Sequence, residues 1–568
     1  MSLSYDLMDL ETLTLNAKQI QDDVLKEILT LNVHTEYLQR FLHGSSDKEL
    51  FKKNVPVVSY DDVKPYIERV ANGEPSDVIS GNPITGFFLS SGTSGGKHKI
   101  LPMNNKFFEN MIQLNALSSP FISRYMDGAK QEKEMKISFC RPLSKTPSGL
   151  PVSGVLSSFV TSNYFKNQPK EMYTSPKDVT LCPDNKQSMY CHLLCGLVQR
   201  NEVTSISAYF ASTLAHAINF LETNWKELSS NIRHGHVSEW ITDRSCRDSV
   251  STILGEPNPE LATLVDYECS QKSWEGIITR LWPKAKFLDC IATGQMGQYI
   301  PTLDFYSNQL PIFSMVYASS ETIFGINVDL SCKPHDVSYT CLPNMSYFEF
   351  IQVDDEENKD EIVDLVNVTL GCYYELLVTN YFGLHRCKVG DILQVTGFYN
   401  SVPQFRFIRR KEMVLSIQTE ITTEEYLLKA LNHATLVLEA SNLMLMGSTC
   451  YADLSTIPGH YVFYWELKSK SINGVELVNS VMVKCCCVME ESLSYLYRIF
   501  RSKDGSIGAL EIRVVQEGTF DSLMEFFVSR GSSMSQYKTP ICIKSSEALT
   551  VLEDKVLSRF FSDKCPHL

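Results

Sequence analysis

Helical and β-rich segments alternate through most of this chain, and that alternation limits the folds open to it. Apolar residues recur at helical spacing over 188–198 and 210–221, whereas short runs rich in β-branched and aromatic residues occupy 311–317, 347–353 and 376–379. Alternating strands and helices pack as layers, with helices covering sheets. The sequence therefore predicts an α/β fold.

The start of the chain carries a helical pattern of its own. Residues 9–43 place apolar side chains, among them Ile20 and Ile28, at helical spacing. A further helix is predicted over 61–70, because its first turn is acidic and suits the positive end of the helix dipole. The chain is therefore expected to open with helices.

A different pattern follows the basic cluster Arg409-Arg410-Lys411. A β-rich stretch, 390–408, leads into this cluster. The residues after it predict a strand, a helix, a strand, a helix and a strand, at 413–417, 424–438, 461–467, 490–498 and 510–515. We place a domain boundary here, with residues 1–410 as the N-terminal domain and 411–568 as a compact α+β domain of ordinary size.

The composition favours a folded protein with no general affinity for polyanions. Of 568 residues 43% are hydrophobic, and 66 acidic against 52 basic residues give a formal net charge of −14. Such a charge argues against nucleic acid or an anionic membrane as partner. The 17 cysteines are odd in number and lack zinc-ligand spacing, and no apolar run is long enough to span a bilayer. We expect a cytoplasmic protein without disulfides.

Residues 84–99 join a β-rich run to a loop of glycine and hydroxyl residues. Backbone N–H groups in such a loop approach an anion closely, the hydroxyls donate hydrogen bonds, and Lys97 or Lys99 supplies charge. This pattern predicts a phosphate-binding loop. It is not a Walker A loop, because His98 follows Lys97 where that motif requires serine or threonine.

The same loop allows two other interpretations. Residues 92–96 fit the Gly-x-Ser-x-Gly elbow of serine hydrolases, with Ser94 as the nucleophile. That elbow must open into a helix, whereas the glycines and Pro102 favour a hairpin. A solvent-exposed flexible loop without function is the other alternative.

Two later segments suggest the rest of a nucleotide site. Tyr317, at the end of the predicted strand 311–317, would stack on a base, and Glu321 would hold Mg²⁺ through oxygen. Asp391 could accept hydrogen bonds from both ribose hydroxyls, with Arg386 or Lys388 facing phosphate. Each segment taken alone is more typical of an ordinary strand edge or turn.

Together and in this order, the three segments resemble the ATP/AMP signatures of the adenylate-forming enzymes, the superfamily of acyl-CoA synthetases and luciferases. The sequence is more closely similar to one plant branch, the Gretchen Hagen acyl-acid amido synthetases, over nearly the whole chain. The matching stretches are 90–96, 293–299, 317–321, 389–391, 396–400 and 536–540. Within that family it looks nearest the benzoate- or chorismate-type branch.

The resemblance implies an ATP- and Mg²⁺-dependent ligase acting in two half-reactions. A small carboxylic acid, benzoate-like, chorismate-like or auxin-like, would be adenylated with release of pyrophosphate. A free amino acid would then displace AMP and form an amide. The implied fold is a large N-terminal domain of β-barrel, sheets and helices with a smaller mobile C-terminal α+β domain, in a monomer.

The resemblance also assigns residues. ATP or AMP would contact Ser90, Ser91, Gly92, Thr93, Ser94, Gly95, Tyr299, Tyr317, Ser319, Ser320, Arg386, Asp391 and Phe398. Glu321 would bind Mg²⁺ and act in catalysis together with Lys429 and Lys538. The acyl-substrate pocket would include Ser118, Phe210, Thr213 and His216.

Several positions depart from the family pattern. His385 and Cys387 stand where aromatic rings are common, Lys388 where an arginine is common, and Ile541 where an arginine often follows the tail motif. Exchanging an arginine fork for a lysine point charge predicts weaker nucleotide binding. Ser118 stands where the benzoate branch is expected to carry arginine.

Three other functions therefore stay open beside amide synthesis. One is an esterase that depends on Ser94. Another is a protein that binds an acid or a nucleotide without turnover. The third is thioester formation with coenzyme A as the acceptor.

Overall fold

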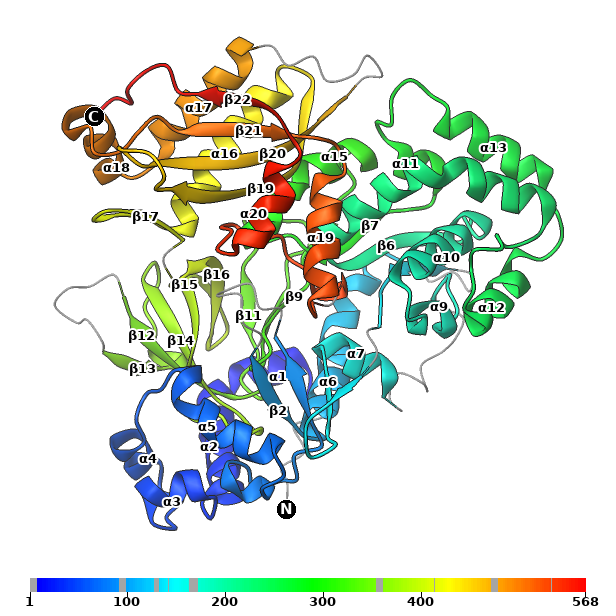
Figure 1. The fold of residues 1–568 in the computed structure, drawn as a ribbon. Helices are drawn as coiled ribbons and strands as arrows, with labels where there is room; N and C mark the ends of the chain where they lie inside the picture. The colour runs from blue at the N-terminus through cyan, green and yellow to red at the C-terminus, as the bar shows by residue number, and fades with distance from the viewer. Residues whose placement is uncertain are drawn as a thin grey trace.

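The computed structural model describes residues 8–90, 99–126, 132–140, 143–162, 172–353, 361–412, 414–470, 479–532 and 534–568. A large N-terminal part runs from the opening helices to strand β16, and a smaller C-terminal unit lies at the upper left of Figure 1, above β12, β14 and β15 and beside α11. Between β16 and β17 the chain crosses once from one part to the other, through residues 411–414. The fold is the predicted mixture of α and β layers.

An eight-stranded antiparallel sheet carries much of the N-terminal part, in the order β13-β12-β14-β15-β16-β11-β10-β9. Its strands are β9 (Val316–Ala318), β10 (Ile323–Asn327), β11 (Tyr339–Cys341), β12 (Tyr347–Gln352), β13 (Ile362–Asp364), β14 (Tyr373–Thr379), β15 (Cys387–Tyr399) and β16 (Val402–Arg410). The predicted strands at 347–353 and 376–379 are confirmed as β12 and β14. The stretch 390–408 contains two strands, β15 and β16.

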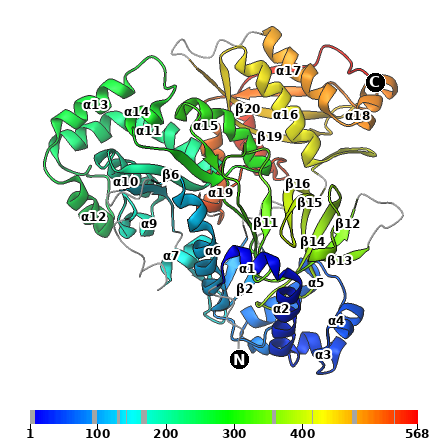
Figure 2. The same ribbon diagram turned by 180° about the vertical axis from the view of Figure 1, so that it is seen from behind.

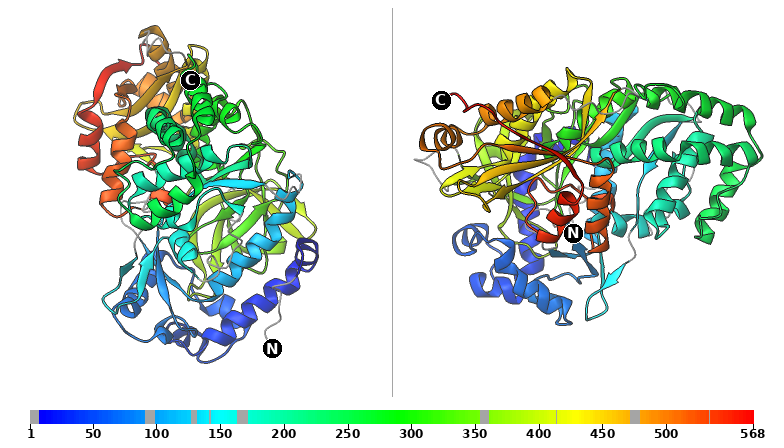
Figure 3. Two further views of the ribbon diagram at one scale, coloured as in Figure 1. Left: turned by 90° about the vertical axis from the view of Figure 1, so that its right-hand side faces the viewer. Right: turned by 45° about the horizontal axis from the view of Figure 1, so that its top comes forward.

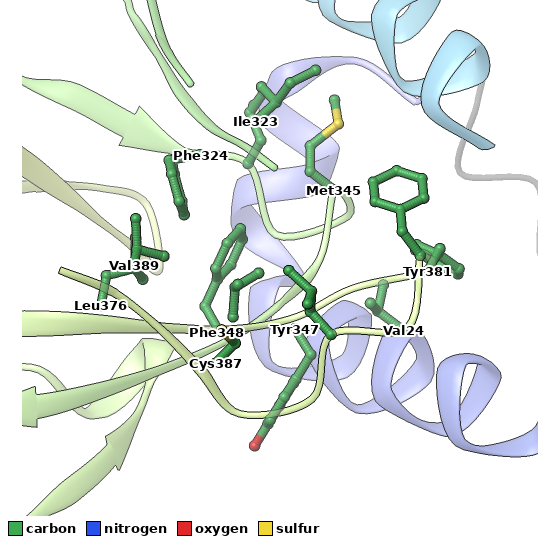
Figure 4. Packing of buried hydrophobic residues seen from close by; sticks show 14 of the residues in the cluster. Val24, Ile323, Phe324, Met345, Tyr347, Phe348, Leu376, Tyr381, Cys387 and Val389 are labelled. Atoms are coloured by element: carbon green, nitrogen blue, oxygen red, sulfur yellow. The ribbon is translucent and has the colours of Figure 1, made fainter. Parts of the chain in front are cut away.

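The opening helices pack against this sheet. They are α1 (Leu10–Leu15), α2 (Ala17–Asn32), α3 (Glu36–Leu42), α4 (Lys48–Asn54) and α5 (Tyr60–Ala71). The apolar side of α2, including Ile20 and Ile28, is fully buried in the same core as the sheet residues. Figure 4 shows Val24 of α2 in one cluster with Tyr347, Phe348 and Tyr381. The predicted opening helices are confirmed.

A second, parallel sheet has the order β3-β6-β7-β8 and a core of its own. Its strands are β3 (Lys133–Ile137), β6 (Val203–Phe210), β7 (Phe287–Ile291) and β8 (Ile312–Phe313). The surrounding helices are α9 (Lys177–Leu181), α10 (Asn185–Val198), α11 (Ala211–His234), α12 (Arg244–Leu254), α13 (Pro259–Cys269), α14 (Ile277–Leu281) and α15 (Ile300–Ser307), of which α9 to α13 lie at the right of Figure 1. The helices predicted at 188–198 and 210–221 correspond to α10 and the first half of α11.

A third small sheet holds the two sides of the predicted phosphate loop. Strand β1 (Gly86–Leu89) pairs antiparallel with β2 (Ile100–Met103), and β5 (Pro151–Ser153) and β4 (Ser144–Lys145) complete the sheet. Helices α6 (Lys106–Ser123) and α7 (Val155–Thr161) lie beside it in Figure 2 and follow in sequence. The hairpin predicted around residues 92–102 is confirmed by the β1–β2 pairing.

The C-terminal unit is a sheet with helices on both faces, as the right-hand view of Figure 3 shows. Strands β19 (Leu443–Asp453), β20 (His460–Ser469), β21 (Glu511–Val515) and β22 (Val556–Phe561) form it, preceded by the hairpin of β17 (Leu415–Ile417) and β18 (Glu420–Thr422). Phe463 and Trp465 face α16 (Glu424–Glu439) and α17 (Asn479–Ser492), whereas Val462 and Tyr464 face α19 (Thr519–Ser529) and α20 (Ser546–Glu553). This two-residue alternation is what a strand buried on both faces requires.

The C-terminal pattern was predicted correctly in most of its elements. The strands near 413–417, 461–467 and 510–515 and the helix at 424–438 are present as β17, β20, β21 and α16. The helix predicted at 490–498 is wrong in its extent, since α17 ends at Ser492 and α18 (Tyr495–Ile499) begins after Ser494 caps it. Strand β19 was not predicted, because its first four residues are all apolar and Gly447 and Ser448 follow them, so no period-two alternation marks it.

All 17 cysteines lie in described parts of the chain, and none of them forms a disulfide there. Among the described residues, three or more His, Cys, Asp or Glu side chains nowhere gather as metal ligands. Over the same residues, helices long and apolar enough to cross a membrane are absent.

Candidate functional site

A cavity of about 360 Å³ opens between the N-terminal part and the C-terminal unit. Its polar wall includes Ser90, Lys99, Ser319, Ser320, Glu321, Asp391, Arg410, Glu424 and Lys538. Its apolar wall includes Val155, Leu156, Tyr209, Phe210, Ile291 and Phe407. Segments that lie hundreds of residues apart in the sequence thus share one cavity.

Strand pairing builds one corner of the cavity around Asp391. In the β15–β16 ladder Asp391 lies directly opposite Arg410, and Arg410 Nη1 is 2.7 Å from Asp391 Oδ1. The Tyr317 hydroxyl donates to Asp391 Oδ2 at 2.6 Å. Burial, followed by the Asp391 charge, raises the pKa of Tyr317, so this hydroxyl stays a donor. The Asp391 side chain is only 3% exposed, so its charge is held by these partners.

Glu321 lies in a tight turn after β9. The Glu321 N–H donates to Ser319 Oγ at 3.2 Å, and the Ser319 N–H donates to the carbonyl of Thr322 at 2.9 Å. Asn380 donates to the carbonyl of Glu321 at 2.8 Å from the end of β14. The turn therefore has a fixed backbone and brings Ser319, Ser320 and Glu321 to the cavity wall.

Lys538 enters the cavity from the C-terminal unit. Its ammonium group lies 4.7 Å from the centre of the Phe210 ring, within the range of a cation–π contact. Burial, with Arg410 adding to it, lowers the pKa of Lys538 to about 8, although the Asp391 and Glu424 carboxylates oppose the change. A half-buried ammonium group without a direct salt bridge in the described residues is available to an incoming anion.

Glu424 ties the first turn of α16 to the same corner. Its carboxylate accepts the backbone N–H of Arg410 at 2.8 Å, and its side chain is almost fully buried. Burial raises the pKa of Glu424. This contact joins the C-terminal unit to the strand that carries Arg410.

Both sides of the predicted phosphate loop reach the cavity. The Ser90 N–H donates to the carbonyl of Lys99 at 2.9 Å, and the Lys99 N–H donates to Ser90 Oγ at 2.9 Å. Ser91, Gly92, Thr93, Ser94 and Gly95 lie outside the described residues. A strand, β2, follows this loop, and not the helix that a serine hydrolase elbow needs.

Arg386 does not line the cavity, which corrects its expected contact with phosphate. It is buried on the other side of the β14–β15 connection, where its guanidinium group binds Glu349 at 2.9 Å. It also donates to the carbonyls of Lys52 and Val55 at 2.7 and 2.9 Å. Four of the five N–H donors of this guanidinium group are used within the protein, so the group is held away from the main cavity.

Three other expected site residues also lie away from the main cavity in this conformation. Phe398 is 44% exposed on the distal end of β15, opposite Pro403. Lys429 is exposed on α16. Ser118 is buried on α6, where its hydroxyl donates to the carbonyl of Asn115 at 3.4 Å.

Tyr299, Thr213 and His216 line a second, smaller cavity of about 60 Å³. The segment 537–539 separates the two cavities. Tyr537 and Thr539 line the smaller cavity, whereas Lys538, between them, lines the main one. Of the four residues expected in the acyl-substrate pocket, only Phe210 lines the main cavity.

Two of the residues that differ from the family pattern lie away from the main cavity, where the sequence predicted contacts with the nucleotide. Cys387 is buried in the hydrophobic core, and His385 stacks on Tyr37 at 5.8 Å between ring centres. Neither lines the main cavity, so an effect of these two residues on nucleotide contacts loses its basis. Ile541 does line the cavity.

Arg410 and Glu424 are the site residues that sequence reasoning missed. Arg410 was placed in a basic cluster at a domain boundary, although pairing the predicted strands would have set it opposite Asp391. Glu424 is predicted only as the first residue of the helix at 424–438, and nothing in its local sequence signals the Arg410 backbone.

Comparison with known proteins agrees with this geometry. Residues 6–312 match the GH3 family N-terminal domain, residues 339–410 the GH3 family central domain, and residues 425–547 the GH3 family C-terminal domain. The chain belongs to the GH3 family.

Two relatives from Arabidopsis thaliana match over almost their full length. The 4-substituted benzoates-glutamate ligase GH3.12 is 55% identical over 561 residues, covering 97% of each chain. The indole-3-acetic acid-amido synthetase GH3.17 is 51% identical, covering 98% of this chain and 96% of the relative. The GH3 chain described here is accordingly an acid–amino acid ligase, as the resemblance implied.

A solved structure supports the fold. The GH3.15 acyl acid amido synthetase superposes with a TM-score of 0.92 at 48% identity, covering 100% of this chain and 99% of that chain. The predicted fold, a mixed α/β N-terminal part with a smaller C-terminal unit, is confirmed. The benzoate ligase among the relatives agrees with the predicted branch.

Proposed function

We propose that this GH3 protein uses ATP to adenylate a small aromatic carboxylic acid and then transfers the acyl group to an amino acid. The observation that carries the proposal is the single cavity shared by Ser90, Glu321, Asp391 and Lys538. A carboxylate is a poor acyl donor because its leaving group would be oxide. Conversion to a mixed anhydride with phosphate supplies a good leaving group.

Each half-reaction forms one bond and breaks another. A carboxylate oxygen attacks the α-phosphorus of ATP, and pyrophosphate leaves. The amine of the amino acid then attacks the acyl carbonyl, loses a proton to solvent or a basic side chain, and expels AMP. Because two anions must meet in the first step, the protein has to neutralise charge at the phosphates.

The cavity residues fit these needs. Lys538 would place a positive charge at the phosphates, together with the backbone N–H groups of the loop after Ser90. Asp391 would accept hydrogen bonds from the ribose hydroxyls, and Tyr317 would border the adenine. The ribose hydroxyls would then replace Arg410 as the partner of the Asp391 carboxylate.

Glu321 suits a Mg²⁺ ion bound with ATP. It contributes a carboxylate oxygen to the cavity wall, and Mg²⁺ commonly binds one or two carboxylates together with substrate phosphates. When bound, Mg²⁺ would neutralise developing charge on pyrophosphate. The protein would thus use ATP as substrate and Mg²⁺ as cofactor.

The apolar wall indicates the class of acid. Tyr209, Phe210 and Leu156 offer aromatic and aliphatic surface near Lys538, which suits a flat ring whose carboxylate points to the phosphates. One relative is named for benzoates and glutamate, and another for indole-3-acetic acid. We therefore propose benzoates first and auxin-like acids second as substrates, with glutamate first among the acceptors, in a monomeric cytoplasmic enzyme.

Acid-dependent exchange of labelled pyrophosphate into ATP tests the proposal. Wild-type protein with Mg²⁺ is expected to exchange with at least one acid from a panel of substituted benzoates, chorismate and indole-3-acetic acid. Adding glutamate should then yield an amide of the expected mass, whereas coenzyme A should yield no thioester. Absence of exchange with every acid would overturn the proposal.

Asp391→Asn is expected to weaken AMP binding by about 10- to 100-fold. Hydrogen bonds to a charged acceptor contribute about 1.5–3 kcal/mol, and the amide offers the ribose hydroxyls no charge. Isothermal titration calorimetry with AMP measures the change. Tyr317→Phe, which removes a hydrogen bond to the same carboxylate but keeps the ring, is the matched control and should retain AMP affinity within about threefold. Unchanged AMP affinity in Asp391→Asn would exclude the ribose role.

A further inference from the structure

The orientation of the C-terminal unit depends on non-covalent contacts. One short connection, 411–414, joins this unit to the N-terminal part. Lys538 belongs to the C-terminal unit, whereas Phe210 and Asp391, which face it, belong to the N-terminal part. Whatever fixes the contact between the two parts therefore also fixes Lys538 in the cavity.

Helix α11 supplies a polar stripe for that contact. Asn219 and Glu222 are separated by one turn, and both reach Lys468 on β20 of the C-terminal unit. The Lys468 ammonium group forms an ion pair with the Glu222 carboxylate and donates to Asn219 Oδ1 at 3.2 Å. The Lys468 and Glu222 side chains are 15% and 27% exposed, so water screens the pair only weakly.

A second contact lies further toward the start of α11. His216 Nδ1 is 2.8 Å from Asp521 Oδ1 in the first turn of α19. The His216 contact precedes Asn219 by three residues, so both contacts fall on one side of the helix. Figures 1 and 2 show the helix α15 between α11 and the C-terminal sheet, and Thr302 of α15 donates to the carbonyl of Leu445 at 3.2 Å.

The interface around these contacts is incompletely filled and combines polar contacts with apolar packing, since Met524 and Met534 pack against the core of the second sheet. The cavity of about 60 Å³ lies beside the His216–Asp521 contact and is also lined by Glu466 and Tyr537. Interfaces between domains of one chain resemble transient interfaces, and relative motion of the domains is the ordinary expectation. The ion pairs add directional contacts to this apolar packing and so help to fix the orientation.

Helix α11 begins directly after a residue of the cavity wall. Phe210, whose ring lies under the Lys538 ammonium group, immediately precedes the first residue of α11. The same helix therefore positions the surface on which Lys538 rests and the side chains that hold the unit carrying Lys538. An acid bound against Phe210 would lie at the start of this helix.

We propose that Glu222 and Lys468, supported by His216 and Asp521, form an interdomain clamp that positions Lys538 for the adenylation step. These four are positioning residues, since they act through Lys538 and do not line the main cavity. The clamp depends on the proposed adenylation function only where it is tested by pyrophosphate exchange. The clamp is specific to the first half-reaction, because pyrophosphate has left before the amine attacks.

A double-mutant cycle tests the clamp. Glu222→Gln and Lys468→Met are each expected to lower the rate constant of acid-dependent pyrophosphate exchange by about tenfold, with the KM for the acid within twofold of wild type. The double variant should fall no further than either single variant, because the two side chains act as one pair. Aminolysis of a preformed acyl-adenylate should stay within about twofold of wild type. Glu517→Gln is the matched control, since Glu517 is 3.7 Å from the same ammonium group but 65% exposed.

Hydrogen exchange gives a readout that does not depend on activity. In both single variants, backbone amides of residues 536–545 should exchange faster than in wild type, while those of α2 should not change. Equal exchange rates in all proteins would overturn the clamp even if wild type proved inactive with every acid. Pyrophosphate exchange at wild-type rates in both single variants would overturn it as well.

Discussion

Replacing Lys538 by methionine is expected to lower acid-dependent pyrophosphate exchange by about 100- to 1,000-fold. A preorganised donor aimed at developing charge in a water-poor site typically contributes that much to a rate. Methionine keeps the length of the side chain over Phe210 and removes only the charge. Initial rates of exchange at saturating ATP and acid measure the effect. Exchange within threefold of wild type would remove Lys538 from the mechanism.

The pH profile gives an independent check on the same residue. Because the pKa of Lys538 is lowered to about 8, its amine loses the proton, and with it the attraction for phosphate, as the pH rises past 8. The kcat/KM for exchange should fall with an apparent pKa near 8 in the free enzyme. Lys538→Arg should flatten that limb up to pH 9, because arginine stays charged.

Removing the Lys538 charge should lower activity, but it should not lower the stability of the fold. The pKa of Lys538 is about 8 in the folded protein and about 10.5 in the unfolded chain, so the folded state binds fewer protons between these values. Below pH 8 Lys538 is charged in both states, and the folded protein bears the full cost of desolvating that charge. As the pH rises from 8 to 10.5 the folded state loses the charge first, so this cost falls and the protein becomes more stable. Lys538→Met should accordingly melt no lower than wild type at pH 7. A lower melting temperature would mean that the activity loss reflects damage to the fold.

Arg386→Ala is expected to lower the free energy of unfolding by about 3–5 kcal/mol. Removing one partner of a buried ion pair leaves the other charge uncompensated. Here the Glu349 carboxylate would be stranded, together with the carbonyls of Lys52 and Val55. Chemical denaturation followed by tryptophan fluorescence measures the loss. This is the largest stability effect that we expect from a single substitution in the chain.

Lys388→Ala is the matched control for Arg386. Lys388 lies two residues further on and is exposed, so its substitution should change stability by less than about 0.5 kcal/mol. The interpretation of Arg386 as a phosphate ligand predicts the reverse outcome. Loss of ATP affinity at unchanged stability in Arg386→Ala would restore that interpretation.

The local pattern was sufficient for most elements of the fold. Helical spacing identified α2, α10 and α16, and β-rich runs identified β12, β14 and β20, because each of these elements buries a continuous apolar face. Strand β19 escaped because Gly447 packs against the Phe520 ring in α19, a contact that its neighbours in sequence do not signal. The split between α17 and α18 escaped because Ser494 acts as a helix cap only in its folded position.

For the candidate site, the sequence by itself determined which chemistry is present. The family motifs placed hydroxyls, carboxylates and a lysine in segments that the fold brings to one cavity, since each residue type was recognisable in its own short stretch. Only the tertiary structure decided which of those side chains face the cavity. Arg386 turns to Glu349 and Arg410 to Asp391 because strand register and burial set the partner of each guanidinium group. The positive charge of the two arginines could not show which of them faces the cavity, because the partner of each lies on a strand that is distant in the sequence.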